Sequence, residues 1–220
     1  MDALTPPRTL VERAYEAILD AICDGTLEPG ERLTQDDVAR RLKVSRQPIT
    51  NALAMLKAHG FVREAGGRGV VVAPLEGKRF DDIYQYRSAV EPLAVRLAIP
   101  RLTKADIKLG RAMIEKGQAK AAQGNARELL RADMDFHFFI YHLADNSLIL
   151  ETMRLNWHHL RRAMREVIRT PQFPVSIWTE HAAVFEAMAE GDANEAARVM
   201  QDHITRAHKQ VQPLLAAGTL

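Results

Sequence analysis

Apolar residues recur at every third or fourth position along most of the chain, which is the spacing of an amphipathic helix. In the first sixty residues this pattern predicts three short helices, at 10–22, 34–42 and 45–60. Thr9 precedes the first helix as an N-cap, and Gly25 follows it as a stop signal. The turn-rich segment between the first two helices predicts a connector.

The pattern becomes β-rich after the third helix. Two β-rich runs, at 61–64 and 70–73, flank a glycine-rich tip and predict a hairpin. Three helices followed by a hairpin, within about 70 residues, are typical of a winged helix-turn-helix. We assign this domain to residues 1–74.

The rest of the chain has helical spacing throughout. After a linker at 75–78, breaks at proline, glycine and asparagine divide the sequence into about six helices. The predicted ranges are 79–98, 103–123, 126–144, 147–168, 174–190 and 192–215. Because each helix has one apolar stripe, residues 79–220 should pack as an antiparallel bundle. The predicted fold class is therefore mostly α, with a winged helix-turn-helix followed by an all-α bundle.

Composition narrows the class of protein. With 47% hydrophobic and 26% charged residues, the 220-residue chain resembles an ordinary globular protein and not a disordered one. Its single cysteine, Cys23, excludes an internal disulfide and fits a reducing compartment. No apolar run is long enough to span a membrane, and the N-terminus lacks the pattern of a secretion signal. We therefore expect a cytoplasmic protein with no membrane partner.

The net charge of +2 conceals a basic segment. Residues 40–68 contain seven lysines and arginines and one acid, a balance of +6, whereas residues 1–39 contain three cations and nine acids. Basic charge on a recognition helix and wing is what contact with DNA phosphates requires. A solvated basic face is the alternative for the charge alone. Its coincidence with the predicted helix-turn-helix favours DNA binding.

Helix phase indicates which side chains read the DNA. The apolar positions of the third helix face the core, so the polar residues near its N-terminus point outward, toward the major groove. Arg46 can bond a guanine edge, and Gln47 or Asn51 can pair with adenine. At the tip of the wing, Arg68 can enter a minor groove or bind phosphate. The predicted DNA-binding residues are Arg40, Arg46, Gln47, Thr50, Asn51, Arg68 and Gly69.

Motifs in this region carry a family resemblance. GTLEPGERL at 25–33 is similar to the G-x-L-x-P-G-x-x-L segment of GntR-type bacterial transcription regulators. DVARRLKVSRQPITNAL at 37–53 resembles their LA-x-x-L-G-V-S-R-x-P-V-R-x-AL core, and GFV at 60–62 with Arg68-Gly69 resembles their wing. The resemblance implies a transcription regulator that binds double-stranded operator DNA. A symmetric homodimer would require half-sites related by a two-fold axis.

Two residues of the recognition helix depart from the family pattern. Where this chain has Thr50, family members usually carry Arg, and Glu is usual where it has Asn51. The methyl group of Thr50 can instead contact thymine. We therefore predict an operator whose sequence differs from the usual one.

The helical region contains seven of the eight histidines. Asp133 and His137 lie four residues apart and share a helix face, while His181 and His203 fall in the fifth and sixth predicted helices. One carboxylate and three imidazoles suit zinc or another borderline transition ion. Taken singly, each histidine is more often a packed or surface residue, so spacing alone leaves the set open.

A second resemblance concerns these residues. DMDFH at 133–137, Glu180-His181 and His203 resemble motifs of the FCD effector domain of FadR/VanR-type GntR regulators, and six helices favour the VanR-like branch. In that family the four positions ligate a metal, and a small organic acid completes the coordination. The ligand chemistry suits zinc, with nickel or manganese as alternatives, and the resemblance implies a small carboxylate effector. The implied metal ligands are Asp133, His137, His181 and His203.

Arg87 is the candidate residue for binding the effector. Arg87-Ser-Ala-Val-Glu91 resembles the R-x-x-x-E segment of the first helix in the same domain. If Arg87 points inward, its guanidinium can bind a carboxylate through two hydrogen bonds. The alternative is a surface ion pair with Glu91, one helical turn away.

These observations predict a repressor whose effector releases it from DNA, and not an enzyme. One alternative is a metal-dependent enzyme with a DNA-binding appendage, which would need a general base beside the metal. The chain contains no HExxH motif, and Glu180 should point about 100° away from its neighbour His181 on the helix. The other alternative is a regulator whose metal is purely structural.

Overall fold

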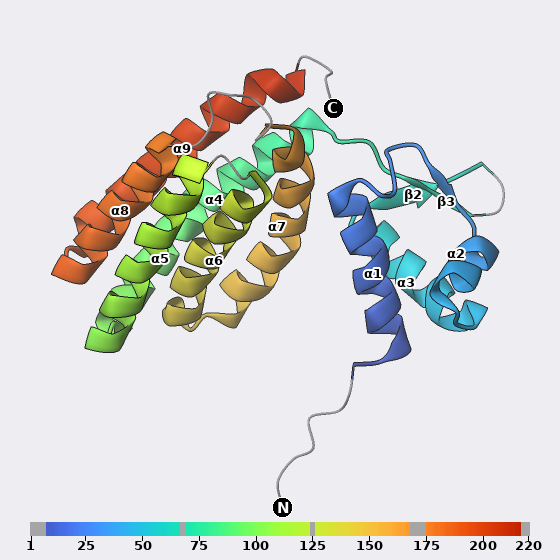
Figure 1. Ribbon diagram of the computed structural model, residues 1–220, viewed down its shortest axis with the longest axis horizontal. Coiled ribbons are helices and arrows are strands. Elements are labelled where there is room, and N and C mark those ends of the chain that lie inside the picture. The colour runs from blue at the N-terminus through green and yellow to red at the C-terminus, as the bar shows by residue number, and fades with distance from the viewer. Residues whose placement is uncertain (1–7, 67–68, 124–125, 168–174, 217–220) are drawn as a thin grey trace, which may run out of the picture. The chain divides into compact units, whose positions relative to one another are not determined.

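The computed structural model describes residues 8–66, 69–123, 126–167 and 175–216. Its internal contacts divide the chain into two compact units, of which the first ends at Leu75 and the second begins at Glu76. Within the described residues the chain is mostly helical, and its strands are confined to the first unit (Figure 1). The predicted fold class is confirmed.

Three helices form most of the first unit. They are α1 (Leu10–Asp24), α2 (Gln35–Leu42) and α3 (Arg46–Ala58). Thr9 caps α1 as predicted: its hydroxyl accepts the backbone N–H of Glu12, whose carboxylate accepts the N–H of Thr9. Thr34 likewise accepts the backbone N–H of Asp37 at the start of α2. Ser45 stands at the N-cap of α3 without a side-chain hydrogen bond to the helix.

A small antiparallel sheet completes this unit. The predicted hairpin consists of β2 (Val62–Glu64) and β3 (Val70–Val72), and β1 (Arg32–Leu33) pairs with the other edge of β3. The expectation of a simple connector before α2 was therefore incomplete. A strand of two residues has no alternation to detect, and backbone hydrogen bonds between 30–31 and Val72 set its register.

The second unit contains the six predicted helices, each beginning and ending within two residues of its predicted limits. They are α4 (Gly77–Ala98), α5 (Lys104–Gln123), α6 (Ala126–Ala144), α7 (Ser147–Val167), α8 (Val175–Glu190) and α9 (Ala193–Ala216). A short 3₁₀ helix, η1 (Ile99–Arg101), extends α4 and was not predicted. Residues 168 and 174, at predicted helix limits, lie outside the described residues.

Helix packing places aromatic side chains at the centre of this bundle. Helix α4 packs along α9 and α6, and α8 packs against α9 and α5. Helix α5 can approach α8 closely because Gly110 and Gly117 face Phe185 and Trp178. The largest buried side chains of the unit include Trp157, Trp178, Tyr141, Phe136 and Phe185. Four of them, Trp157, Trp178, Tyr141 and Phe136, pack against the histidines of the polar site described below.

Candidate metal centre and nucleic-acid interface

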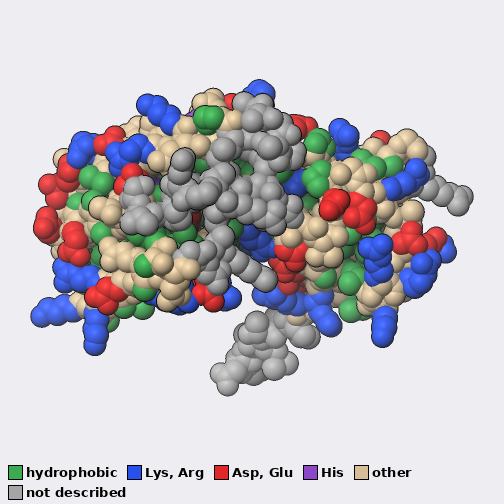
Figure 2. Space-filling model, turned by 45° about the horizontal axis from the view of Figure 1, so that its top comes forward, with side chains coloured by type: hydrophobic (Ala, Val, Ile, Leu, Met, Phe, Trp, Pro, Cys, Tyr) green, Lys and Arg blue, Asp and Glu red, His purple; other side chains and the backbone are tan. Residues whose placement is uncertain are grey.

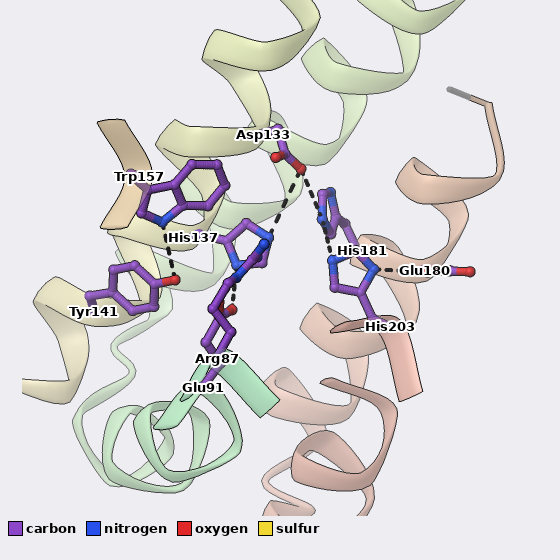
Figure 3. A network of polar contacts seen from close by, with 9 residues as sticks. All are labelled: Arg87, Glu91, Asp133, His137, Tyr141, Trp157, Glu180, His181 and His203. Atoms are coloured by element: carbon purple, nitrogen blue, oxygen red, sulfur yellow. Dashed lines mark hydrogen bonds and ion pairs between the residues drawn. The ribbon is translucent and has the colours of Figure 1, made fainter. Parts of the chain in front are cut away.

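The bundle brings all four candidate metal ligands together. His137 of α6, His181 of α8 and His203 of α9 are 0%, 0% and 2% exposed. Asp133, one turn before His137, places Oδ1 3.3 Å from His181 Nε2 and 3.9 Å from His137 Nε2. The Nε2 atoms of His181 and His203 are 3.2 Å apart. Figure 3 shows the three rings and the carboxylate converging on one point.

The spacing of these atoms fits a transition metal. Tetrahedral zinc with bonds of ~2.0–2.1 Å keeps neighbouring ligand atoms about 3.4 Å apart. The ligating nitrogens of the three histidines all lie within 4.8 Å of one another. Both ring nitrogens of His137 are buried without a hydrogen-bond partner in the structure, and a metal ion would give Nε2 its partner. The donor set and its geometry therefore fit the group that the sequence predicts.

Burial keeps the histidines in the form that binds metal. Burial, together with the positive charge that His203 and His137 would carry, holds the pKa of His181 well below its ordinary value. Burial also lowers the pKa of His203, against the opposing effect of its hydrogen bond to Glu180. These two imidazoles are consequently neutral near pH 7, as metal ligation requires.

Two glutamates lie beside Nδ1 of His137 and of His203, the ring nitrogens opposite the candidate metal-binding Nε2 atoms. The Oε2 atom of Glu91 on α4 lies 2.7 Å from His137 Nδ1, and Oε2 of Glu180 lies 2.8 Å from His203 Nδ1. Burial opposes ionisation of Glu91, but Arg87 and His137 together hold the pKa of this carboxyl well below its ordinary value. Sequence reasoning gave neither glutamate this role. Their proximity to Arg87 and His181 in the sequence was the available signal.

Arg87 is buried in the bundle, and it forms the ion pair considered as the alternative. Its Nε donates to Glu91 Oε1 at 2.5 Å, and both side chains are buried instead of lying at the surface. The guanidinium carbon lies 4.9 Å from the centre of the Trp157 ring and 5.2 Å from that of Tyr84. A buried charge needs such compensation, so the pair is part of the centre's architecture.

The predicted base-reading residues lie at the start of α3. Arg46, Gln47 and Asn51 are exposed, while Ile49, Ala52 and Leu53 are buried, as helix phase predicts. The Thr50 hydroxyl donates to the backbone carbonyl of Arg46 at 3.1 Å, and the residue is half-buried. Gln47 Nε2 donates to Asn51 Oδ1 at 3.4 Å.

The folded chain places acids beside the basic segment. Arg40 pairs with Asp37 at 3.0 Å, and Arg46 pairs through Nε with Asp36. Basic and acidic side chains intermingle on the face drawn in Figure 2. The strong separation of charge along the sequence is therefore reduced in space, because α2 begins with acids that face the following cations.

The structure accounts for the wing only in part. Arg68, predicted to contact DNA, lies outside the described residues. Gly69 has φ +102°, and a Cβ there would lie 2.5 Å from the carbonyl oxygen of Leu33. Pairing between β1 and β3 therefore explains the glycine without reference to DNA.

Each of the two units matches a known protein family. Residues 10–72 match the sequence pattern of bacterial regulatory proteins of the gntR family, and residues 82–206 match the FCD domain. The Nta operon transcriptional regulator of Aminobacter aminovorans is 29% identical over 187 residues, which cover 85% of this chain and 87% of that protein.

Solved structures share the architecture. McbR/YncC of E. coli has a TM-score of 0.81 at 19% identity, over 94% of this chain and 99% of that one. A putative GntR regulator from Rhodococcus sp. RHA1 has a TM-score of 0.75 at 25% identity, over 91% and 96%. The fold and these similarities define a DNA-binding transcription regulator. The chain belongs to the gntR family and carries a C-terminal FCD domain.

Among the described residues, no helix combines the length and apolarity needed to cross a bilayer.

Proposed function

We propose that this chain is a cytoplasmic, homodimeric repressor whose affinity for operator DNA is controlled by a small organic acid bound at a metal ion. The metal is zinc, with nickel and manganese as alternatives. The observation that carries the proposal is the convergence of one carboxylate and three buried imidazoles inside the FCD domain.

In this proposal the metal couples the effector to the protein. Asp133, His137, His181 and His203 would hold the ion, which would supply an open coordination position for a carboxylate oxygen. These side chains orient and shield the ion. Arg87 is the proposed partner for the rest of the carboxylate, and it would bind through its Nη edge because its Nε is committed to Glu91.

The DNA half of the proposal rests on α3. Arg46 and its neighbours would enter the major groove, and the methyl of Thr50 would contact thymine. Arg40 and the wing residues Arg68 and Gly69 would contact the backbone or minor groove. A two-fold dimer reads a palindromic operator, and an effector that binds one arrangement of the DNA-binding domains more tightly shifts operator affinity.

Selection of binding sites from random double-stranded DNA tests the DNA half. We expect a palindromic sequence that differs from the usual family operator at the base facing Thr50. Arg46→Ala should weaken binding to the selected site by at least tenfold in an electrophoretic shift, with Arg96→Ala on α4 as control. Recovery of the ordinary family sequence would contradict the altered-operator proposal.

Elemental analysis and a thermal-shift screen test the effector half. His137→Ala and His181→Ala should lose the bound metal, whereas His142→Ala, an exposed histidine on α6, should retain it. Small carboxylates should raise the melting temperature of the wild-type protein, and a chelator should abolish the rise. Stabilisation that persists after chelation would show that the metal is structural and the effector binds elsewhere.

The competing enzyme function gains no support from the geometry. Glu180 would be the obvious general base, but it bonds Nδ1 of His203, on the ring edge away from the metal-facing Nε2, and also pairs with Arg206. It anchors a ligand and does not face the ion's open side. Turnover of hydroxy or keto acids by the metal-loaded protein would contradict this assignment.

A further inference from the structure

We propose that Glu91 is a positioning residue for the metal centre, which makes α4 a structural part of that centre. Glu91 presents no atom to the metal. It fixes the ring of His137 so that Nε2 carries a free electron pair toward the ion. The inference rests on the proposed metal site, and it assigns that site a component outside the four ligands.

Glu91 and His137 meet in the interior of the bundle. Glu91 and His137 are both 0% exposed, and Glu91 Oε2 lies 2.7 Å from Nδ1. A neutral imidazole has one N–H, and a carboxylate can only accept a hydrogen bond. At a separation of 2.7 Å the carboxylate favours the tautomer with its proton at Nδ1, although the contact lacks ideal hydrogen-bond geometry. The opposite nitrogen, Nε2, faces Asp133 and has no hydrogen-bond partner.

Arg87 allows Glu91 to play this role. A buried carboxylate without a counter-charge would take up a proton, and a protonated acid would not fix the tautomer in this way. Arg87 Nε donates to the second oxygen, Oε1, at 2.5 Å, while Oε2 faces His137 Nδ1 at ion-pair distance. Trp157 and Tyr84 cover the guanidinium and keep the pair out of water.

The other glutamate provides an internal comparison. Glu180 plays the equivalent part for His203, but its side chain is 17% exposed and its partner Arg206 is 48% exposed. Water can replace a hydrogen bond at the edge of the bundle. At Glu91 it cannot, because the carboxylate is fully enclosed. Loss of Glu91 should therefore affect metal binding more than loss of Glu180.

The position of Glu91 has a regulatory consequence. Helix α4 begins at Gly77, two residues after the end of the first unit at Leu75. Metal held by His137 is thus linked through Glu91 to the helix that follows the DNA-binding unit directly. Metal binding should therefore protect the backbone amides of α4 from hydrogen exchange, although α4 supplies no ligand.

The test compares full-length wild type with Glu91→Gln and Glu180→Gln after removal of metal with a chelator. Glu186→Gln is the control, because Glu186 lies on α8 and pairs with Arg111 at the surface. Competition with a chromophoric chelator gives the affinity for Zn²⁺. We expect Glu91→Gln to weaken binding by about 10–100-fold and Glu186→Gln to leave it unchanged. Glu180→Gln should fall between them.

Two further readouts separate positioning from general damage. Histidine ¹⁵N spectra of the metal-free wild type should show His137 protonated at Nδ1, and Glu91→Gln should lose that preference. If Glu91→Gln loses helicity because Arg87 is left unpaired, the pair Arg87→Met with Glu91→Gln removes both charges. The double variant should show the same weakening of Zn²⁺ binding while remaining folded.

Failure of the metal site and failure of the positioning role give different results. If the wild type binds no Zn²⁺, the metal part of the proposed function fails together with this inference. If the wild type binds Zn²⁺ and a folded Glu91 variant binds it within twofold as tightly, the site stands and the positioning role is wrong. Wild-type binding that leaves hydrogen exchange in α4 unchanged would overturn the link to that helix.

Discussion

Replacement of Gly117 by alanine should destabilise the bundle, even though alanine is the better helix former. A Cβ at Gly117 would lie 2.1 Å from Cζ3 of Trp178 and 2.2 Å from two further ring atoms. Ordinary carbon–carbon contacts are about 3.5–4.0 Å, so the indole or the helix must move by about 1.5 Å. Trp178 is only 1% exposed, and its ring packs edge-on against His181 with centroids 4.9 Å apart.

Two opposing effects set the expected change in the free energy of unfolding of Gly117→Ala. Overpacking a well-filled core costs about 1–3 kcal/mol, and this overlap with a rigid ring belongs at the upper end. The higher helix propensity of alanine returns about 1 kcal/mol. We therefore expect a net loss of about 2 kcal/mol in the free energy of unfolding. For a domain of this size, that corresponds to a fall in melting temperature of about 4–8 °C.

Tryptophan fluorescence during urea unfolding measures this change selectively. Both tryptophans of the chain, Trp157 and Trp178, lie in the second unit, so the signal reports the bundle alone. Gly77→Ala is the matched control, because a Cβ there meets nothing within 4 Å. It should be neutral or stabilising by up to about 1 kcal/mol. Equal stability of Gly117→Ala and Gly77→Ala would refute the packing argument.

Three other results are expected. Asp36→Asn should tighten DNA binding by about two- to fivefold in fluorescence anisotropy, because it removes a like charge from the phosphates and frees Arg46. Metal-free protein should lose stability between pH 7 and pH 5.5, measured by urea midpoint. His181 has a lowered pKa when folded, so the unfolded chain takes up more protons as the pH falls through about 6.5. Tyr15→Phe should destabilise the first unit by about 1 kcal/mol in calorimetry, because it removes the 2.8 Å hydrogen bond to His59 Nδ1.

Each of these three predictions can be checked against a control variant or contradicted by a specific result. For DNA, Asp82→Asn on α4 should leave affinity unchanged, and a salt dependence identical to wild type in Asp36→Asn would contradict the charge argument. For pH, a urea midpoint that rises on acidification would show that the buried imidazole is not the neutral form. For Tyr15, Tyr86→Phe removes an exposed hydroxyl contact to Thr152 and should have a smaller effect.

The sequence predicted the local elements well because their causes are local. A cap such as Thr9 and the spacing of apolar residues act over a few positions, so the helix limits fall within two residues of expectation in the bundle. The four candidate metal ligands were named from motifs and from the shared face of Asp133 and His137, and the fold brings them together. Strand β1 was missed because only its partner β3 defines it.

What the sequence by itself determined was the set of elements and the ionisable residues available for a site. It could not decide the partners of those residues, because a partner from another helix is set by packing. Whether Arg87 would meet an effector or Glu91, and whether that pair would be exposed, depended on how α4 lies against α6 and α7. The same pair that would contribute little in water becomes part of the buried polar cluster around the candidate metal ligands once the tertiary structure removes the water.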